Sequence, residues 1–297
     1  MLKHNQHEKD CTCSIYAHIL IFKLLLAQTR PIQDVRRVTV TSKCEIVDGN
    51  KTNKYAVFKQ NIYDSLGQLH TIVQFSLSTG KVESYIWNTF QNGLLIRTEE
   101  YNDDKLIQRT DYSYTTKSLI NNETVYRVVG NDTVLHLNLK YTYSSQGKPT
   151  KINAKTAQGK KAYILLSAYD NNGHEIKRKV NAKKGFMPKD SILEIKNQPK
   201  FNTQGRIESE QIFVKYYNGS TINSIYKYLY DDKGNMVQKT GFDANGNLLF
   251  TYNYKYNSKG KVIVVDKLDS TNKIVESFAM RYEAYPKSDI TRREVEY

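Results

Sequence analysis

The chain has 297 residues and a formal net charge of +14, from 44 Lys and Arg against 30 Asp and Glu. A chain of this length can bury a core as one large domain, and a single cysteine, Cys44, beyond the N-terminal segment excludes a disulfide framework. The positive charge is compatible with an anionic partner such as nucleic acid, an acidic glycan or a phosphate-bearing envelope polymer, but we favour the alternative of a lysine-rich composition produced by AT-rich codons.

The N-terminal segment holds the one long apolar run of the chain, residues 14–27, with the sequence SIYAHILIFKLLLA. An apolar run of this kind, followed by a polar stretch, predicts a secretory signal peptide that covers residues 1–27. We therefore expect a secreted, periplasmic or cell-surface protein. The run is shorter than the about 20 residues that a membrane helix needs, so no transmembrane span is predicted; a retained run would form a core or interfacial helix.

Residues 28–62 predict an N-terminal β segment. Val38, Val40 and Ile46 alternate with polar residues, which is the period of a half-buried strand. The Asp48-Gly49 pair then predicts a turn.

Residues 63–282 predict an array of short β repeats. In the stretch 226–265, Gly234, Gly246 and Gly260 each follow an Asp or Asn by three residues, and the glycines lie 12 and 14 residues apart. The Asp or Asn side chain bonds its own backbone, and the glycine supplies the positive φ that closes a type I turn with a bulge. The repeats predict an all-β fold, an antiparallel β-meander with a period of 12–14 residues and more than a dozen strands.

Two stretches interrupt the array. Between residues 110 and 140 the turn signals are weak, and the pairs Asn121-Asn122 and Gly130-Asn131 predict hairpins around the run 125–129. Residues 181–200 carry two prolines, which limit strand pairing, and predict an inserted basic loop. Residues 283–297 form a polar tail.

Tyrosines gather on one face of the predicted sheet. Tyr226 and Tyr228 share a face of one strand, and Tyr252 and Tyr254 repeat the arrangement later. Leaving such rings in water forfeits about 1.5 to 3 kcal/mol each, so we expect the sheet to curl, to fold into two layers or to meet a partner. The rings form either the core or a platform that stacks on sugar rings.

The positive charge is concentrated between residues 151 and 200, which hold twelve Lys and Arg against four acids. Lys177, Arg178, Lys183 and Lys184 are the candidate residues of a basic patch that binds a glycan or polyanion together with the tyrosines. The alternative is a solvated surface, since neighbouring residues on a strand point to opposite faces and lysines on edge strands block sheet-to-sheet aggregation.

Seven copies of the repeat signature begin at Tyr63, Tyr143, Tyr169, Phe201, Tyr230, Phe242 and Tyr256. The best copy, residues 230–236, reads YDDKGNM. These copies resemble the YD repeats of the Rhs family of bacterial cell-surface and secreted proteins, and the Asn-Gly turns at 92–93 and 218–219 are also similar to MORN-type hairpins. The resemblance implies a structural or binding role outside the cytoplasm. With fewer repeats than the large family members, the chain is not expected to close a hollow shell.

The sequence contains no recognisable catalytic motif. Nucleophile-elbow, phosphate-loop and dinucleotide-binding patterns are absent, and His70, His136 and His174 occur singly rather than in ligand pairs. We expect no enzymatic activity, no cofactor, no metal and no specific nucleic acid. The leading hypothesis is an exported β-repeat scaffold or binding protein of the bacterial envelope, with a surface glycan or another envelope protein as partner; the alternative is a glycan- or polyanion-binding module.

Overall fold

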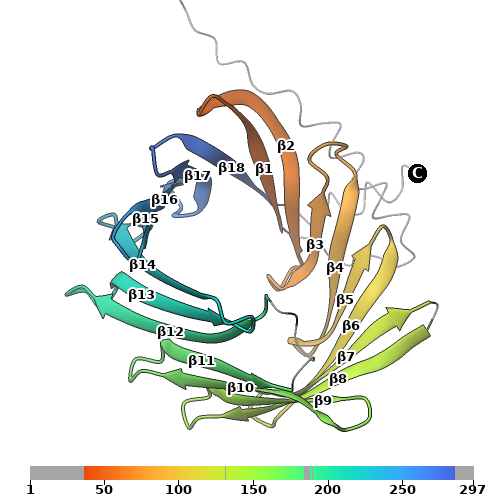
Figure 1. Cartoon of the computed structure of the whole chain (residues 1–297). Helices are drawn as coiled ribbons and strands as arrows, with labels where there is room; N and C mark the ends of the chain where they lie inside the picture. The colour runs from red at the N-terminus through yellow and green to blue at the C-terminus, as the bar shows by residue number, and fades with distance from the viewer. Residues whose placement is uncertain (1–36, 131, 184–187, 189, 285–297) are drawn as a thin grey trace, which may run out of the picture.

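The computed structural model describes residues 37–130, 132–183, 188 and 190–284, which form one 18-stranded antiparallel sheet. The strands are β1 (Arg37–Val47), β2 (Asn50–Tyr63), β3 (Leu69–Phe75), β4 (Val82–Gln91), β5 (Leu94–Asn102), β6 (Lys105–Tyr114), β7 (Ile120–Val129), β8 (Asp132–Tyr143), β9 (Pro149–Thr156), β10 (Lys161–Tyr169), β11 (Glu175–Ala182), β12 (Ile192–Phe201), β13 (Ile207–Tyr216), β14 (Thr221–Tyr230), β15 (Met236–Asp243), β16 (Leu248–Tyr256), β17 (Val262–Asp269) and β18 (Ile274–Ala284). Each strand pairs with the next, and β18 pairs with β1, so the sheet closes into a barrel (Figure 1).

The all-β antiparallel meander is confirmed, but the expected curled or two-layered sheet is wrong, because the sheet closes into a barrel. Strand β1 closes the barrel by pairing with β18 from Arg37 opposite Ala284 to Lys43 opposite Phe278. A bulge interrupts the register beside most hairpins, for example between Leu229 and Tyr230. Bulges increase local twist and bend the strand, and their repetition around the sheet supplies the curvature that closure needs.

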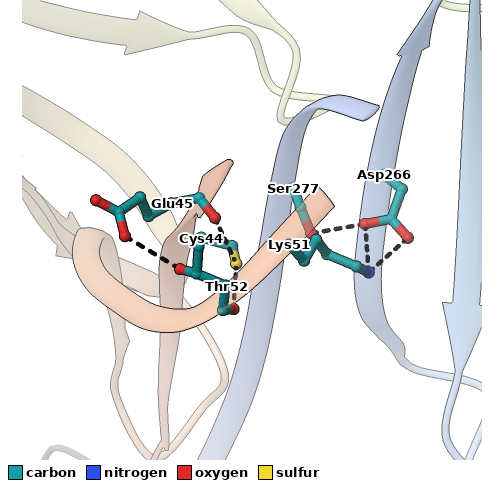
Figure 2. A network of polar contacts seen from close by, with 6 residues as sticks. All are labelled: Cys44, Glu45, Lys51, Thr52, Asp266 and Ser277. Atoms are coloured by element: carbon teal, nitrogen blue, oxygen red, sulfur yellow. Dashed lines mark hydrogen bonds and ion pairs between the residues drawn. The ribbon is translucent and has the colours of Figure 1, made fainter. Parts of the chain in front are cut away.

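A polar network reinforces the closure (Figure 2). The Lys51 Nζ atom, on β2, donates to both carboxylate oxygens of Asp266 at 2.9 Å, and the Ser277 hydroxyl donates to the same carboxylate at 2.6 Å. Nearby, the buried thiol of Cys44 donates to the carbonyl of Thr52 at 3.2 Å. The network joins β2, β17 and β18 across the intervening strand β1, so it stabilises the junction between the two ends of the meander.

The hairpins have the predicted turn chemistry. At the turn after β14, the Asp231 N–H donates to the carbonyl of Asn235, and the Gly234 N–H donates to the carbonyl of Asp231. The Asp231 carboxylate accepts a bond from the Asn235 N–H at 2.8 Å, and Gly234 has a φ of 84°. In two hairpin turns that lack glycine, Asp104 and Asn272 adopt the positive φ instead, with values of 58° and 62°.

Two boundaries differ from the predicted ones. Residues 121 and 122 lie within β7, and the preceding hairpin closes at Thr115–Leu119 instead, since Thr115 caps that turn through its own side chain. The predicted loop 181–200 is shorter: β11 continues to Ala182, and β12 begins at Ile192. Pro199 lies opposite Glu210 in that strand, because the pairing of its neighbours outweighs one missing N–H donor. The predicted signal peptide and most of the polar tail lie outside the described residues.

The tyrosine that ends many strands has a structural role. Its hydroxyl donates to a carbonyl at the start of the preceding strand, at 2.6–3.0 Å: Tyr114 to Leu95, Tyr143 to Ile120, Tyr169 to Pro149, Tyr230 to Ile207, Tyr256 to Met236 and Tyr282 to Val262. Each of these residues pairs with the following strand and bonds the preceding one. The repeated tyrosine therefore ties three strands together at one end of the barrel.

Replacing Tyr230 with Phe is expected to lower the free energy of unfolding by about 1 kcal/mol, because the substitution removes one hydrogen bond to the Ile207 carbonyl while keeping the ring. The measurement is chemical denaturation of both proteins. The matched control is Tyr254→Phe, whose hydroxyl has no such bond among the described residues; equal losses in the two variants would contradict the assignment.

A larger repeat underlies the array. The Tyr141 hydroxyl bonds the Glu123 carboxylate, and Tyr228 bonds Glu210 in the same way, at a common offset of 87 residues (228 − 141 and 210 − 123). The same offset relates three turn glycines to later ones, Gly147 to Gly234, Gly159 to Gly246 and Gly173 to Gly260. The six strands β6–β11 thus correspond to β12–β17.

Two apolar clusters lie on opposite faces of the sheet. One comprises Val38, Val40, Ile62, Val73, Phe75 and Tyr85 on β1–β4, and the other comprises Leu139, Ala154 and Ala162 on β8–β10. Following the paired residues from strand to strand shows that the first cluster lies on the face of the sheet to which Lys155 of β9 also points. The second cluster lies on the opposite face. The apolar face of the sheet therefore changes between β5 and β7.

Candidate anion-binding face

The strand register brings lysines from seven neighbouring strands, β8–β14, to one face of the sheet. Lysines two residues apart on a strand share a face, as Lys177 and Lys179 do on β11. Residues directly opposite each other on paired strands also point to the same face, so one face can be followed from each strand to the next. This lysine face comprises Lys140, Lys151, Lys155, Lys161, Lys177, Lys179, Lys196, Lys200, Lys215 and Lys227. All of them except the half-buried Lys151 are exposed.

Like charges lie directly opposite each other on the lysine face. Lys155 is opposite Lys161, and Lys177 is opposite Lys196. Such pairs are destabilising in a sheet, and two ammonium groups about 5 Å apart repel by about 0.8 kcal/mol even in bulk water. The repulsion between such pairs lowers the stability of the protein.

The carboxylate of Glu194, on β12, lies among these lysines, since Glu194 is opposite Lys179 in the ladder and two residues from Lys196. Its oxygens lie 3.5 Å from the Nζ atom of Lys177 and 4.0 Å from that of Lys196. The Glu194 side chain is 16% exposed, whereas those of the two lysines are about half exposed. Glu194 therefore bridges one like-charge pair and leaves most of the face positive.

The bridge lies at the shortest ladder among the strands that the structure describes. Strands β11 and β12 pair through three residue pairs, from Lys177 opposite Lys196 to Lys179 opposite Glu194, whereas β10 and β11 pair from Tyr163 opposite Ala182 to Tyr169 opposite Glu175. With few backbone hydrogen bonds at this seam, side-chain electrostatics contribute a larger share of its stability.

Replacing Glu194 with Gln is expected to lower the free energy of unfolding by about 0.5 to 1 kcal/mol at low salt, because Lys177 and Lys196 then face each other unbridged. Added salt screens that repulsion, so the loss should shrink in high salt. Denaturant titrations at both salt concentrations measure the difference. The control is Glu175→Gln, which breaks an exposed pair with Arg178 elsewhere on β11; a Glu194→Gln loss that salt leaves unchanged would contradict the account.

The four candidate tyrosines lie on the opposite face from the lysines. Tyr226 and Tyr228 alternate with Lys227 on β14, and Tyr252 is opposite Lys239 in the ladder of β15 and β16. This tyrosine face is half-buried. The Lys239 Nζ atom lies 4.4 Å from the centre of the Tyr226 ring, a distance at which a cation and a ring attract.

Polar contacts hold the tyrosine face in place. The Tyr228 hydroxyl donates to the Glu210 carboxylate, and burial together with that bond raises the pKa of Tyr228 far above its usual value. The rings of Tyr252 and Tyr254 lie 6.5 Å apart. These contacts favour a packed structural surface over an open platform for sugar stacking.

The four candidate basic residues do not gather in one patch. Lys177 belongs to the lysine face, while Arg178 points to the other face and pairs with Glu175. Lys183 is exposed just after β11, and Lys184 lies outside the described residues. The structure therefore brings Lys177 together with lysines on other strands rather than with its neighbours in sequence.

The three histidines lie apart. His174 bonds Asp170 at 3.2 Å within one turn, and burial lowers the pKa of both His70 and His136. Across the residues that the structure describes, no three or more His, Cys, Asp or Glu side chains are placed to hold a metal ion. No described helix has the length and apolar character required to cross a membrane.

No protein-family model and no curated protein matches the chain. Among solved structures, a porin-like protein from Bacteroides uniformis is similar over 86% of this chain and 99% of its own, at 11% identity and a TM-score of 0.43. A porin-like protein from Bacteroides vulgatus matches over 84% and 98%, at 12% identity and a TM-score of 0.32. The Tc holotoxin pore of Photorhabdus luminescens matches over 78% of this chain and 14% of its own, at 13% identity and a TM-score of 0.34. Similarity at these scores carries no argument about ligand or location.

Sequence reasoning missed most of the lysine face. The missed residues are Lys140, Lys151, Lys155, Lys161, Lys179, Lys196, Lys200, Lys215 and Lys227. The available signal was spacing, because Lys151 and Lys155 lie four residues apart on one strand, as do Lys196 and Lys200. The predicted patch relied on basic residues that are adjacent in sequence, such as Lys177 and Arg178. Adjacent residues on a strand point to opposite faces, so they do not form one patch.

Proposed function

We propose that this chain is a non-enzymatic binding protein that holds an acidic polysaccharide on its lysine face. The observation that carries the proposal is the gathering of exposed lysines from β8–β14 on one face, with Lys155 directly opposite Lys161 and with Lys177 opposite Lys196, the pair that Glu194 bridges. A surface that serves only solubility has no need for such pairs, and mixed charges would provide it at lower cost. A ligand that presents negative charges along its length compensates them.

The composition of the face favours a polysaccharide over nucleic acid. Its charges are lysine ammonium groups, which act as point charges, whereas the planar arginine guanidinium suits bidentate binding of phosphate. Two phenylalanines also lie beside these lysines, with the Lys196 Nζ atom 5.5 Å from the Phe213 ring and the Lys227 Nζ atom 5.2 Å from the Phe242 ring. Aromatic rings next to cations suit the apolar faces of acidic sugar units.

We also propose that the protein works at the bacterial cell envelope after export. Residues 1–27 have the pattern of a secretory signal, and the repeat sequences resemble YD repeats of cell-surface and secreted proteins. The N-terminal sequence and intact mass of the protein from fractionated cells test this part. A mature chain beginning at Gln28 in an envelope or secreted fraction supports it, and an uncleaved chain in the cytosol contradicts it.

The binding proposal is tested with polygalacturonate, an acidic polysaccharide, and with dextran as its neutral counterpart. We expect polygalacturonate to bind the protein and dextran not to bind the lysine face. The affinity for polygalacturonate should fall roughly 100-fold between about 50 and 200 mM salt if about four charges are neutralised. Absence of binding to polygalacturonate at low salt would overturn the proposal. Preferential binding of single-stranded DNA in competition would replace the polysaccharide with nucleic acid as the ligand class.

A further inference from the structure

A pocket of about 590 Å³ lies at the end of the barrel where β2 turns into β3 and β4 turns into β5. The turn between β4 and β5 consists of Asn92 and Gly93, with φ values of 51° and 80°, whereas the neighbouring turn after β2 is longer. The short turn beside the longer one leaves a recess between them. Its volume falls within the range of about 300 to 1,000 Å³ found for small-molecule sites.

Aromatic side chains form the inner wall of this pocket. Trp87, the one tryptophan of the chain, is 5% exposed and packs edge-on against the His70 ring, with 4.7 Å between ring centres. Phe90 lines the pocket from the end of the same strand and is half-buried. The wall therefore presents apolar surface that is held in place by packing.

Polar groups form the rest of the lining. Gln68 lies across the recess from Asn92, and its amide donates to the Gly93 carbonyl at 3.0 Å, which joins the two turns. Asn92 and Thr89 contribute an amide and a hydroxyl to the lining. An apolar wall with a few hydrogen-bonding side chains is the composition of a site for a small polar ligand with an apolar face.

The charged groups in the lining are already compensated. The Arg97 Nε atom donates to the Asp111 carboxylate at 2.6 Å. The Asp64 carboxylate accepts bonds from the backbone N–H groups of Leu66 and Gln68 at 2.9 and 2.8 Å. Burial lowers the pKa of His70, which keeps this ring neutral at neutral pH. The pocket therefore offers little net charge to a ligand, in contrast to the lysine face.

We propose that this pocket binds one unit of a neutral sugar, with Phe90 and His70 against the apolar face of the ring and with Asn92 and Thr89 bonded to its hydroxyls. A sugar ring matches the site because one of its faces is apolar while its rim carries donors and acceptors. The proposal is independent of the lysine face, which takes a charged chain elsewhere on the barrel.

The fluorescence of Trp87 reports this site directly, because no other tryptophan contributes to the signal. The probes are cellobiose, lactose, mannobiose and chitobiose, titrated into the full-length protein. We expect at least one of them to cause a saturable shift whose midpoint is the same in low and high salt, since no ion pair forms. If none of the four sugars changes the fluorescence, the proposal is overturned. A salt-independent fluorescence change supports the sugar site even if polygalacturonate does not bind to the lysine face.

Two variants test the residues of the pocket. Asn92→Gly keeps the left-handed turn while removing the amide, and Phe90→Leu removes the aromatic surface; each is expected to weaken sugar binding about tenfold, the effect of losing one good contact. The matched control is Asp48→Gly, which makes the same kind of change at the two-residue turn of β1 and β2, with a φ of 50° at the other end of the barrel. Binding by Asn92→Gly and Phe90→Leu that equals binding by the control would overturn the assignment of the pocket.

Discussion

Replacing Lys177 and Lys196 together with glutamine is expected to weaken polygalacturonate binding at least tenfold at about 50 mM salt. These two lysines face each other across the seam of β11 and β12 near the middle of the lysine face. Their removal should also reduce the slope of log affinity against log salt by about 2, because two fewer counterions are released on binding. Binding titrations at several salt concentrations measure both effects.

The matched control for this variant is the double substitution of Lys239 and Lys267 with glutamine. It removes the same charge from the tyrosine face, where these lysines lie 4.4 Å from the Tyr226 ring and 5.9 Å from the Tyr252 ring. The control should keep the salt slope of the unmodified protein. A similar loss in both double variants would mean that net charge, rather than the lysine face, determines binding.

Replacing Gly241 with Val is expected to lower the free energy of unfolding by about 2 kcal/mol, within the usual range for overpacking. A Cβ atom at this position would lie 2.7 Å from the Cζ atom of Phe250, on the neighbouring strand. The Phe250 ring has little room to move, because Tyr226 and Tyr252 lie 6.2 and 5.3 Å away between ring centres. Thermal unfolding should show a decrease in Tm of roughly 4 to 8 °C.

A double-mutant cycle separates this clash from a general effect on strand β15. Combining Gly241→Val with Phe250→Leu should be less destabilising than the sum of the two single changes by about 1 kcal/mol, since the smaller side chain leaves space for the valine. The control Thr240→Val alters the adjacent residue, which faces the other way. Strict additivity of Gly241→Val and Phe250→Leu would show that their side chains do not compete for the same space.

The 87-residue repeat gives this glycine a counterpart. Ala154 pairs with Tyr163 on β9 and β10 as Gly241 pairs with Phe250 on β15 and β16. Ala154 is 1% exposed, so a small residue is buried against an aromatic ring at both places. The sequence places a small residue at each position, but only the register reveals which ring it accommodates.

Most strands and turns of this protein can be predicted from short stretches of its sequence. Many hairpins are local units in which a side chain such as that of Asp231 caps the turn and a Gly such as Gly234 supplies positive φ, so a few adjacent residues specify the turn. The predicted type I turn with a bulge is confirmed for this reason. Where the turn signal is weak, as at Thr115, the sequence predicts the turn at Asn121-Asn122, several residues after its position in the structure.

The closure of the barrel and the lysine face depend on contacts between residues far apart in the sequence. Closure depends on β1, whose sequence carries no repeat signature, meeting β18 more than 200 residues later, as shown by Lys43 opposite Phe278. The lysine face depends on register, because a shift of one residue would move every lysine of a strand to the other side of the sheet. Alternation within a strand can be deduced from the sequence, whereas the alignment of seven strands is set by bulges and hairpin lengths around the whole barrel.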